Sequence, residues 1–318
     1  MWTAVVGKEL QSRLQGRLTY VILTLMVIAF TGLVLGSFSL IVASVPTLVP
    51  VIGSSVASAT AVSLPGLVGS YRGVFLFIAM AFCVMMALSV VAPAVASTAV
   101  SGEREEGTFD LLLASGLPPS SIVVGKLAAA VGFVLLIVLT AVPGFAMAWM
   151  FGGVPVVDVI LTVLLLLAGL CLFAAIGLFC SALGRTSAVA ALYAYGLIFV
   201  LGTGTFGLYL IGASFQMEPA VRPLLALNPF VVLFSVPEQI SGQVAQVLPF
   251  QYRALLDSNA QQDLFGLGSV RYPRWALTLV LYFLLTVLLV VLSTVAIDPC
   301  HRWKGHRWVR VLLDRGVG

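Results

Sequence analysis

The chain has 318 residues, of which 61% are hydrophobic and only 9% are charged, and its formal net charge is +4. A soluble domain normally carries about 25% charged residues, so this chain has too few charges to cover a surface that faces water. Its four cysteines show neither metal-finger spacing nor a disulfide framework. The composition argues against an ordinary soluble enzyme or binding module, and it predicts an all-α integral membrane protein.

The N-terminal segment, residues 1–17, has apolar residues at helical spacing with polar residues mostly between them. This pattern predicts a helix lying in the membrane interface, and the alternative is a basic flank that only orients the first span. The apolar run 18–45 that follows is longer than the core of a signal peptide, so it is expected to remain as a membrane span. Gly32 and Gly36 within it have the Gly-x-x-x-Gly spacing that permits close helix contact, although chance also explains such a match in a chain with 30 glycines.

Further apolar runs also reach the roughly 20 residues that a helix needs to cross a bilayer. They are residues 73–100, 127–151, 159–183, 188–215 and 275–297. Lipid offers no partners for backbone groups, so helices are expected, six in all with the first run. Pro93 and Pro143 predict kinks in two of these helices, near hydroxyl groups that can bond to the freed carbonyls. Those hydroxyl groups belong to Ser97, Thr98 and Thr140.

One apolar run, residues 223–236, is too short to cross and contains Asn228 followed by Pro229. It is interpreted as a re-entrant or interfacial element within a long outer segment, residues 216–273. The chain shows no internal repeat and no low-complexity linker, so residues 1–318 are treated as a single transmembrane domain.

Lysine and arginine are distributed unequally between the two sides of this six-span arrangement. Eleven lie on the side of the termini: Lys8, Arg13, Arg17, Arg104, Lys126, Arg185, Arg302, Lys304, Arg307, Arg310 and Arg315. Five lie on the other side: Arg72, Arg222, Arg253, Arg271 and Arg274. The excess predicts a multi-pass protein of the cytoplasmic membrane with both termini in the cytoplasm, ending in a basic tail at residues 298–318.

The strongly polar connection, residues 101–126, is expected on the cytoplasmic side. Thr108 is a candidate N-cap, Asp110 suits the first helical turn, and Gly116 can end the helix. These signals predict a short helix over about residues 109–115. Its apolar face is expected to pack either on a soluble partner or back on its own bundle. The residues of that face are Phe109, Leu112 and Leu113.

Ionisable groups are confined to the ends of the spans, which argues against a proton-coupled transporter. A metal site built on Cys300, His301 and His306 is disfavoured, because the same tail is rich in arginine and tryptophan and suits an interfacial anchor. The chain contains no Gly-x-x-x-x-Gly-Lys-Ser/Thr phosphate loop. Neither a cofactor, a metal nor enzyme activity is therefore expected, and any ATP must be bound by another chain.

The run Gly102-Glu-Arg-Glu-Glu-Gly-Thr108, followed by Leu111-Leu-Leu and Gly125-Lys126, resembles the signature of ABC-transporter permeases of the second, exporter-type family. The resemblance extends to weaker pieces at Lys8-Glu9, at Ser181–Ser187 and at Leu227-Asn-Pro229. It implies six spans, an interfacial N-terminal helix, and short re-entrant helices at Asn228 and Pro229. It also implies a dimer with a second permease copy or homologue, with the first and fifth spans near the seam, where Gly32 and Gly36 are candidates.

The same resemblance implies that the polar connection is a coupling helix received by a separate cytoplasmic ABC ATPase. The expected contact residues are Glu103, Arg104, Glu105, Glu106, Gly107, Thr108, Phe109, Leu112 and Leu113. The expected function is that of a permease subunit moving an amphipathic or hydrophobic substrate outward, with lipid and no nucleic acid as a partner. The alternatives are a secondary transporter and a membrane scaffold subunit. The outer segment is longer than a minimal family member needs, so no substrate is carried over.

Overall fold

The computed structural model describes most of the chain between residues 64 and 297. The described residues are 64–114, 118–150, 154–215, 222–233, 264–267, 270–297 and the isolated positions 24, 28, 31, 32, 36 and 39. The interfacial helix predicted at residues 1–17 and the basic tail predicted at residues 298–318 lie outside them, as does most of the first predicted span.

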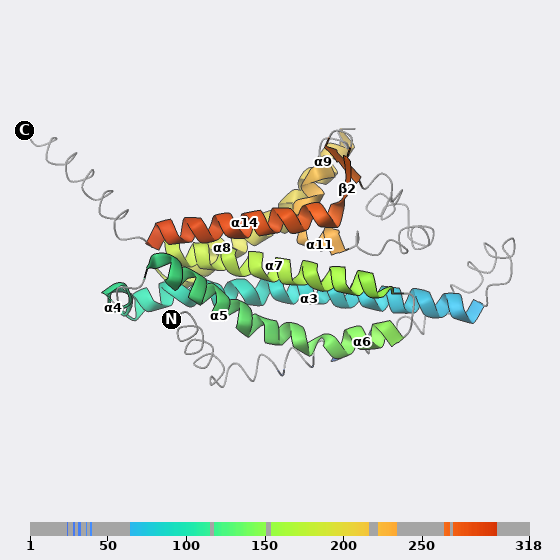
Figure 1. The fold of residues 1–318 in the computed structure, drawn as a ribbon, viewed down its shortest axis with the longest axis horizontal. Coiled ribbons are helices and arrows are strands. Elements are labelled where there is room, and N and C mark those ends of the chain that lie inside the picture. Colours follow the sequence, from blue (N-terminus) through green and yellow to red (C-terminus); the bar gives the residue numbers. More distant parts are fainter. Residues whose placement is uncertain are drawn as a thin grey trace, which may run out of the picture.

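Five helical stretches among the described residues are long and apolar enough to cross a membrane, and they run alongside one another in an elongated bundle (Figure 1). They are Leu76–Glu105, Pro119–Met150, Val156–Leu183, Ser187–Gly212 and Trp275–Ile297. They match the second to sixth predicted spans. The first predicted span shows helical backbone at its isolated described positions, so a count of six stays a prediction.

The five stretches are built from eight helical elements. In chain order these are α3 (Leu64–Glu105), α5 (Pro119–Thr140), α6 (Val142–Met150), α7 (Val156–Leu183), α8 (Ser187–Phe199), the π-helix η1 (Val200–Gly204), α9 (Thr205–Ser214) and α14 (Arg274–Ile297). Short elements connect them: α4 (Phe109–Ala114), the 3₁₀ helix η2 (Arg222–Leu227), α11 (Pro229–Val232), and strands β1 (Leu264–Leu267) and β2 (Val270–Pro273).

Helix α7 lies at the centre of the bundle and packs most extensively on α3 and α14. Large side chains such as Phe77, Phe173 and Tyr282 fill the main core. Towards the α4 end the core is built mainly of small residues, and a Cβ added to Gly177 on α7 would lie 2.8 Å from the Ala96 Cβ on α3. The backbones of α3 and α7 therefore approach most closely there, as small residues allow in membrane helices.

The helix is interrupted near one of the two prolines predicted to cause kinks and is continuous at the other. The third span breaks at Ala141, between α5 and α6 and two residues before Pro143, whereas α3 continues as one helix through Pro93. Ser97 and Thr98 donate to carbonyl groups three residues earlier, after the proline rather than before it. The carbonyl group of Val90, which precedes the proline, accepts from a hydroxyl group of α8: the Tyr195 hydroxyl donates to it at 2.8 Å.

The segment before the last span contains an element that was not predicted. Strands β1 and β2 form an antiparallel hairpin in which Leu264 pairs with Pro273 and Leu267 pairs with Val270. The expectation of an all-α fold is therefore wrong at this hairpin, although the membrane part is helical. Each strand has only four residues, too few to show an alternating pattern, and apolar and aromatic side chains favour the extended backbone.

Candidate functional site

The predicted polar connection begins where α3 ends, at a left-handed residue. Gly107 has φ of 72°, a conformation that costs glycine little and other residues more. The Thr108 N–H donates to the Glu103 carbonyl at 2.9 Å and the Glu106 N–H donates to the Gly102 carbonyl at 3.0 Å. These bonds satisfy carbonyls at the helix end, which is the usual role of a glycine at this position. The chain thereby reverses sharply from α3 into α4.

Helix α4 forms close to the predicted range, from Phe109 to Ala114, with Asp110 in its first turn. Thr108 precedes it as expected, and the Thr108 carbonyl accepts from the Leu112 N–H. The Thr108 hydroxyl, however, donates to the Glu103 carbonyl at 3.3 Å. The residue therefore joins α4 to the end of α3. Gly116, the predicted end of the helix, lies outside the described residues.

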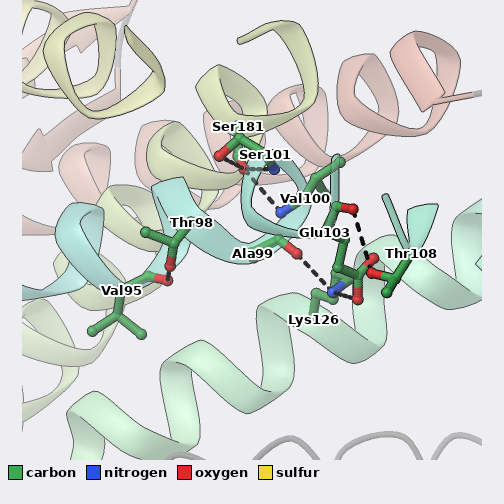
Figure 2. A network of polar contacts seen from close by, with 9 residues as sticks. All are labelled: Val95, Thr98, Ala99, Val100, Ser101, Glu103, Thr108, Lys126 and Ser181. Atoms are coloured by element: carbon green, nitrogen blue, oxygen red, sulfur yellow. Dashed lines mark hydrogen bonds and ion pairs between the residues drawn. The ribbon is translucent and has the colours of Figure 1, made fainter. Parts of the chain in front are cut away.

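A buried lysine on α5 holds the end of α3 (Figure 2). The Lys126 ammonium group is 3% exposed and donates to the Ala99 carbonyl at 2.7 Å and to the Glu103 carboxylate at 2.7 Å. A positive charge near the carbonyl end of a helix is stabilised by the helix dipole. Lys126 thus connects α5 to the last turns of α3 through one charged bond and one backbone bond.

Serine side chains connect α3 to α7 in the same region (Figure 2). The Ser181 hydroxyl oxygen accepts from the backbone N–H groups of Val100 and Ser101, both at 2.9 Å. The Ser101 hydroxyl donates to the Ser97 carbonyl at 2.6 Å. All three serines are buried, so these bonds form away from solvent, where an unmade bond is costly.

Two charged residues of the predicted motif connect α3 to the turn between α7 and α8. The Arg104 guanidinium donates to the Gly184 carbonyl at 2.8 Å, at the C-terminus of α7. The Glu105 carboxylate accepts from the Ser187 N–H at 2.9 Å and from the Ser187 hydroxyl at 2.7 Å, at the N-terminus of α8. A carboxylate there bonds to an otherwise unpaired N–H and is favoured by the helix dipole.

Of the two alternatives for Phe109, the structure shows packing on the chain's own bundle. Its side chain is 6% exposed and packs with small residues of α3 and α7 and with Val123 of α5, and the Arg104 guanidinium carbon lies 4.9 Å from the ring centre. Leu112 is half-buried on the same face, while Leu111 on the opposite face is 72% exposed. Helical periodicity correctly placed Phe109 and Leu112 together but could not say which face the bundle covers. This end of the bundle is therefore one structure in which α4 is packed against its own chain.

The family of the chain is shown by its match to a family profile. The profile described as "ABC-2 family transporter protein" matches residues 54–297, which include all five membrane-spanning stretches and the polar connection. The chain belongs to the ABC-2 transporter family. No curated protein matches its sequence. The resemblance in the acidic Gly-Thr motif is thus confirmed, and the chain is a transmembrane permease of an ABC transporter.

In this ABC-2 permease the face of α4 that points away from the bundle combines acidic and apolar groups. Asp110, Leu111 and Ala114 are exposed there, and Glu106 is exposed at the preceding turn. Leu111 belongs to the Leu111-Leu-Leu run of the resemblance, but it lies outside the Phe109–Leu112 face and was not among the expected contact residues. The exposure of Leu111 could be recognised only once the burial of Phe109 was known.

The remaining predicted site residues are Gly32, Gly36, Asn228, Pro229 and those of the C-terminal tail. No atom lies within 4 Å of a Cβ added to Gly32 or Gly36, so a dimer seam at these glycines stays a prediction. Asn228 and Pro229 are buried between η2 and α11. The candidate metal residues of the tail, Cys300 with two histidines, lie outside the described residues.

Proposed function

We propose that this permease is the membrane subunit of an ATP-driven exporter, and that a separate cytoplasmic ABC ATPase docks on α4. The observation that carries the proposal is the bonding of the α3–α4 corner to the rest of the bundle. Lys126 joins it to α5, Arg104 to the end of α7 and Glu105 to the start of α8. A force applied to α4 would therefore reach three other helices through short polar bonds.

The docking surface proposed for the ATPase is the outward face of α4, defined by Glu106, Asp110, Leu111 and Ala114. Leu111 is the anchor, because a large apolar side chain with 72% exposure buries most of its surface only when a partner covers it. The acidic residues around it favour a partner groove with a basic rim, since complementary charge speeds and orients association. Phe109 serves a different purpose: it fixes α4 to the bundle so that α4 moves with α3.

We propose that the α4 end lies on the cytoplasmic side of the cell membrane and that both termini lie on the same side. Lys126, Arg104 and Arg185 at this end support the placement through the excess of basic residues on cytoplasmic loops. Permeases of this kind work in pairs, so a second copy or a homologue completes the pathway. The substrate is proposed to be amphipathic or hydrophobic and to move outward.

Cysteine labelling tests this orientation directly. In a variant lacking the four native cysteines, A114C on α4 should react with a membrane-impermeant maleimide only after the cells are opened. V156C, at the start of α7 on the opposite end, should react in intact cells. The reverse labelling pattern would exclude the proposed orientation.

The docking surface is tested by co-purification of the ATPase with matched leucine variants. L111A should lower the retained ATPase roughly tenfold, since a buried anchor contributes about 1–3 kcal/mol and each 1.4 kcal/mol is about tenfold. L192A is the control, because Leu192 on α8 is exposed to a similar degree, 70% against 72%, but lies away from α4. The L192A protein should retain its ATPase.

Truncation of Phe109 separates docking from packing. F109A should lower the melting temperature, because it removes a buried ring from the cluster between α3, α5 and α7. L111A should leave the melting temperature unchanged. If L111A retains ATPase at the wild-type level, or if no ATPase accompanies even the wild-type permease, α4 is not its docking site, and a secondary carrier or scaffold role becomes the better explanation.

A further inference from the structure

The membrane-spanning stretch Ser187–Gly212 is interrupted by a π-helical turn at Val200–Gly204, between α8 and α9. A π-turn inserts an extra residue and displaces carbonyl groups from the regular α-helical ladder, and such turns concentrate where helices bend or function. Gly202 at its middle is buried. A Cβ added there would lie 3.2 Å from the Phe230 ring, so another chain segment closely approaches the turn.

That approaching segment carries a buried carboxamide, Asn228, which bonds to two elements at once. Its side-chain oxygen accepts from the N–H groups of Phe230 at 3.0 Å and Val231 at 3.2 Å, and so caps α11. Its side-chain nitrogen donates to the Gly202 carbonyl at 2.7 Å and to the Thr205 hydroxyl oxygen at 3.1 Å. Asn228 is 2% exposed, so both halves of the amide are bonded within the protein.

The segment that carries Asn228 is itself fixed to other helices. On α14, the Thr278 hydroxyl donates to the Ala226 carbonyl at 2.8 Å and the Tyr282 hydroxyl donates to the Leu227 carbonyl at 3.2 Å. On the other side, the Phe230 ring lies 5.6 Å from the Phe82 ring of α3. The η2–α11 segment is therefore a fixed point between α3 and α14, and Asn228 connects the π-turn to it.

We propose that Asn228 is a releasable latch that holds the π-turn against η2–α11 and so fixes the direction of α9 relative to α8. While the amide bonds to Gly202 and Thr205, the turn is closed. When the bonds open, α9 pivots about the glycine-containing turn. The proposal goes beyond the proposed function and does not depend on it, because the latch is a property of this chain alone.

A serine substitution separates the latch from the cap. In N228S the serine oxygen can still cap α11, because serine is a good N-cap residue, but its side chain is too short to reach Gly202. In N228A both roles are lost. Hydrogen–deuterium exchange is measured on the full-length permease in detergent, on peptides that cover residues 200–214, with α7 peptides as an internal reference.

Both N228S and N228A should exchange roughly fivefold faster or more over residues 200–209, as loss of one buried hydrogen bond allows, with α7 unchanged. T205V keeps the shape of Thr205 but removes the acceptor for Asn228 together with the hydroxyl's own bonds to the Leu201 and Gly202 carbonyls, and it should give a change of the same kind. If N228S exchanges like wild type while N228A does not, Asn228 is only a cap and the latch is refuted. If residues 200–209 are unaffected in every variant, the latch is also refuted. Because no ATPase enters this measurement, its result stands whether or not the proposed function holds.

Discussion

The two ends of the bundle are held together by different chemistry. At the α4 end charged bonds stand beside the neutral serine bonds: Lys126 with Glu103, Arg104 with a helix carbonyl, and Glu105 with the start of α8. At the α11 end they are neutral, made by the Asn228 amide and by the hydroxyl groups of α14. Small residues pack the helices at the first end, and the aromatic rings of Phe82 and Phe230 pack them at the second.

This difference fits the roles proposed for the two ends. Glu103 and Arg104 are half-buried and Glu105 is exposed, so they can bond strongly to neighbouring helices at a moderate desolvation cost, whereas Lys126 is buried and depends on its partners. They suit a corner that must transmit a force without changing shape. The Asn228 amide carries no charge, so opening its bonds costs less than separating a buried ion pair, although each buried bond left unmade still costs about 1–3 kcal/mol. The comparison therefore predicts that charge removal weakens the α4 end most, while amide removal loosens the α11 end locally.

The largest expected loss of stability comes from K126M. Methionine keeps much of the volume but leaves the Glu103 carboxylate and the Ala99 carbonyl without the ammonium group. Because Glu103 is 26% exposed, the expected cost is about 2 kcal/mol, less than for a fully buried pair. SDS titration of the purified permease measures it. Adding E103Q to K126M should recover part of the loss, and strict additivity of the two changes would show that the pair is not coupled.

Helix packing at the α4 end is tested by two glycine substitutions in membrane-spanning helices. G177A should cost about 1–3 kcal/mol, because its Cβ would lie 2.8 Å from the Ala96 Cβ and 3.0 Å from backbone atoms of Pro93. G196A is the control, since no atom lies within 4 Å of an added Cβ there and alanine favours a helix. The melting temperature should fall for G177A and stay the same or rise for G196A. Equal shifts would show that α3 and α7 are not in tight contact at this position.

Much of this architecture was readable from the sequence. Long apolar runs located the second to sixth spans, since the bilayer sets the length of a helix and the composition leaves no other fold. The polar connection located α4, because Thr108 and Asp110 suit the start of a helix. Both signals are local, so they need no knowledge of how the helices pack.

Features that depend on contacts between distant segments were not readable in this way. Periodicity grouped Phe109 with Leu112 but gave no means of knowing that α3, α5 and α7 cover Phe109. Asn228 was noted for breaking a helix, while its partner Gly202 lies 26 residues earlier in an apolar run that looks uninterrupted. The hairpin of β1 and β2 was missed because its strands are short. The burial of Phe109 and the bond from Asn228 to Gly202 are tertiary contacts, and a local sequence pattern does not reveal them.

The smallest expected effect concerns Glu105, whose carboxylate is fully exposed to solvent while it bonds to Ser187. In E105Q the amide oxygen can still accept from the Ser187 N–H, so the fold should persist, but the negative charge at the start of α8 is lost. Salt screens exposed charges, so the wild-type melting temperature should fall slightly towards that of E105Q as ionic strength rises, and E105Q itself should respond less. E106Q is the matched control, because Glu106 is a neighbouring exposed carboxylate at the turn after α3. Identical salt responses in the two variants would show that proximity to α8 gives Glu105 no special role, and the link from the end of α3 to the stretch Ser187–Gly212 would then depend on Arg104 at the end of α7.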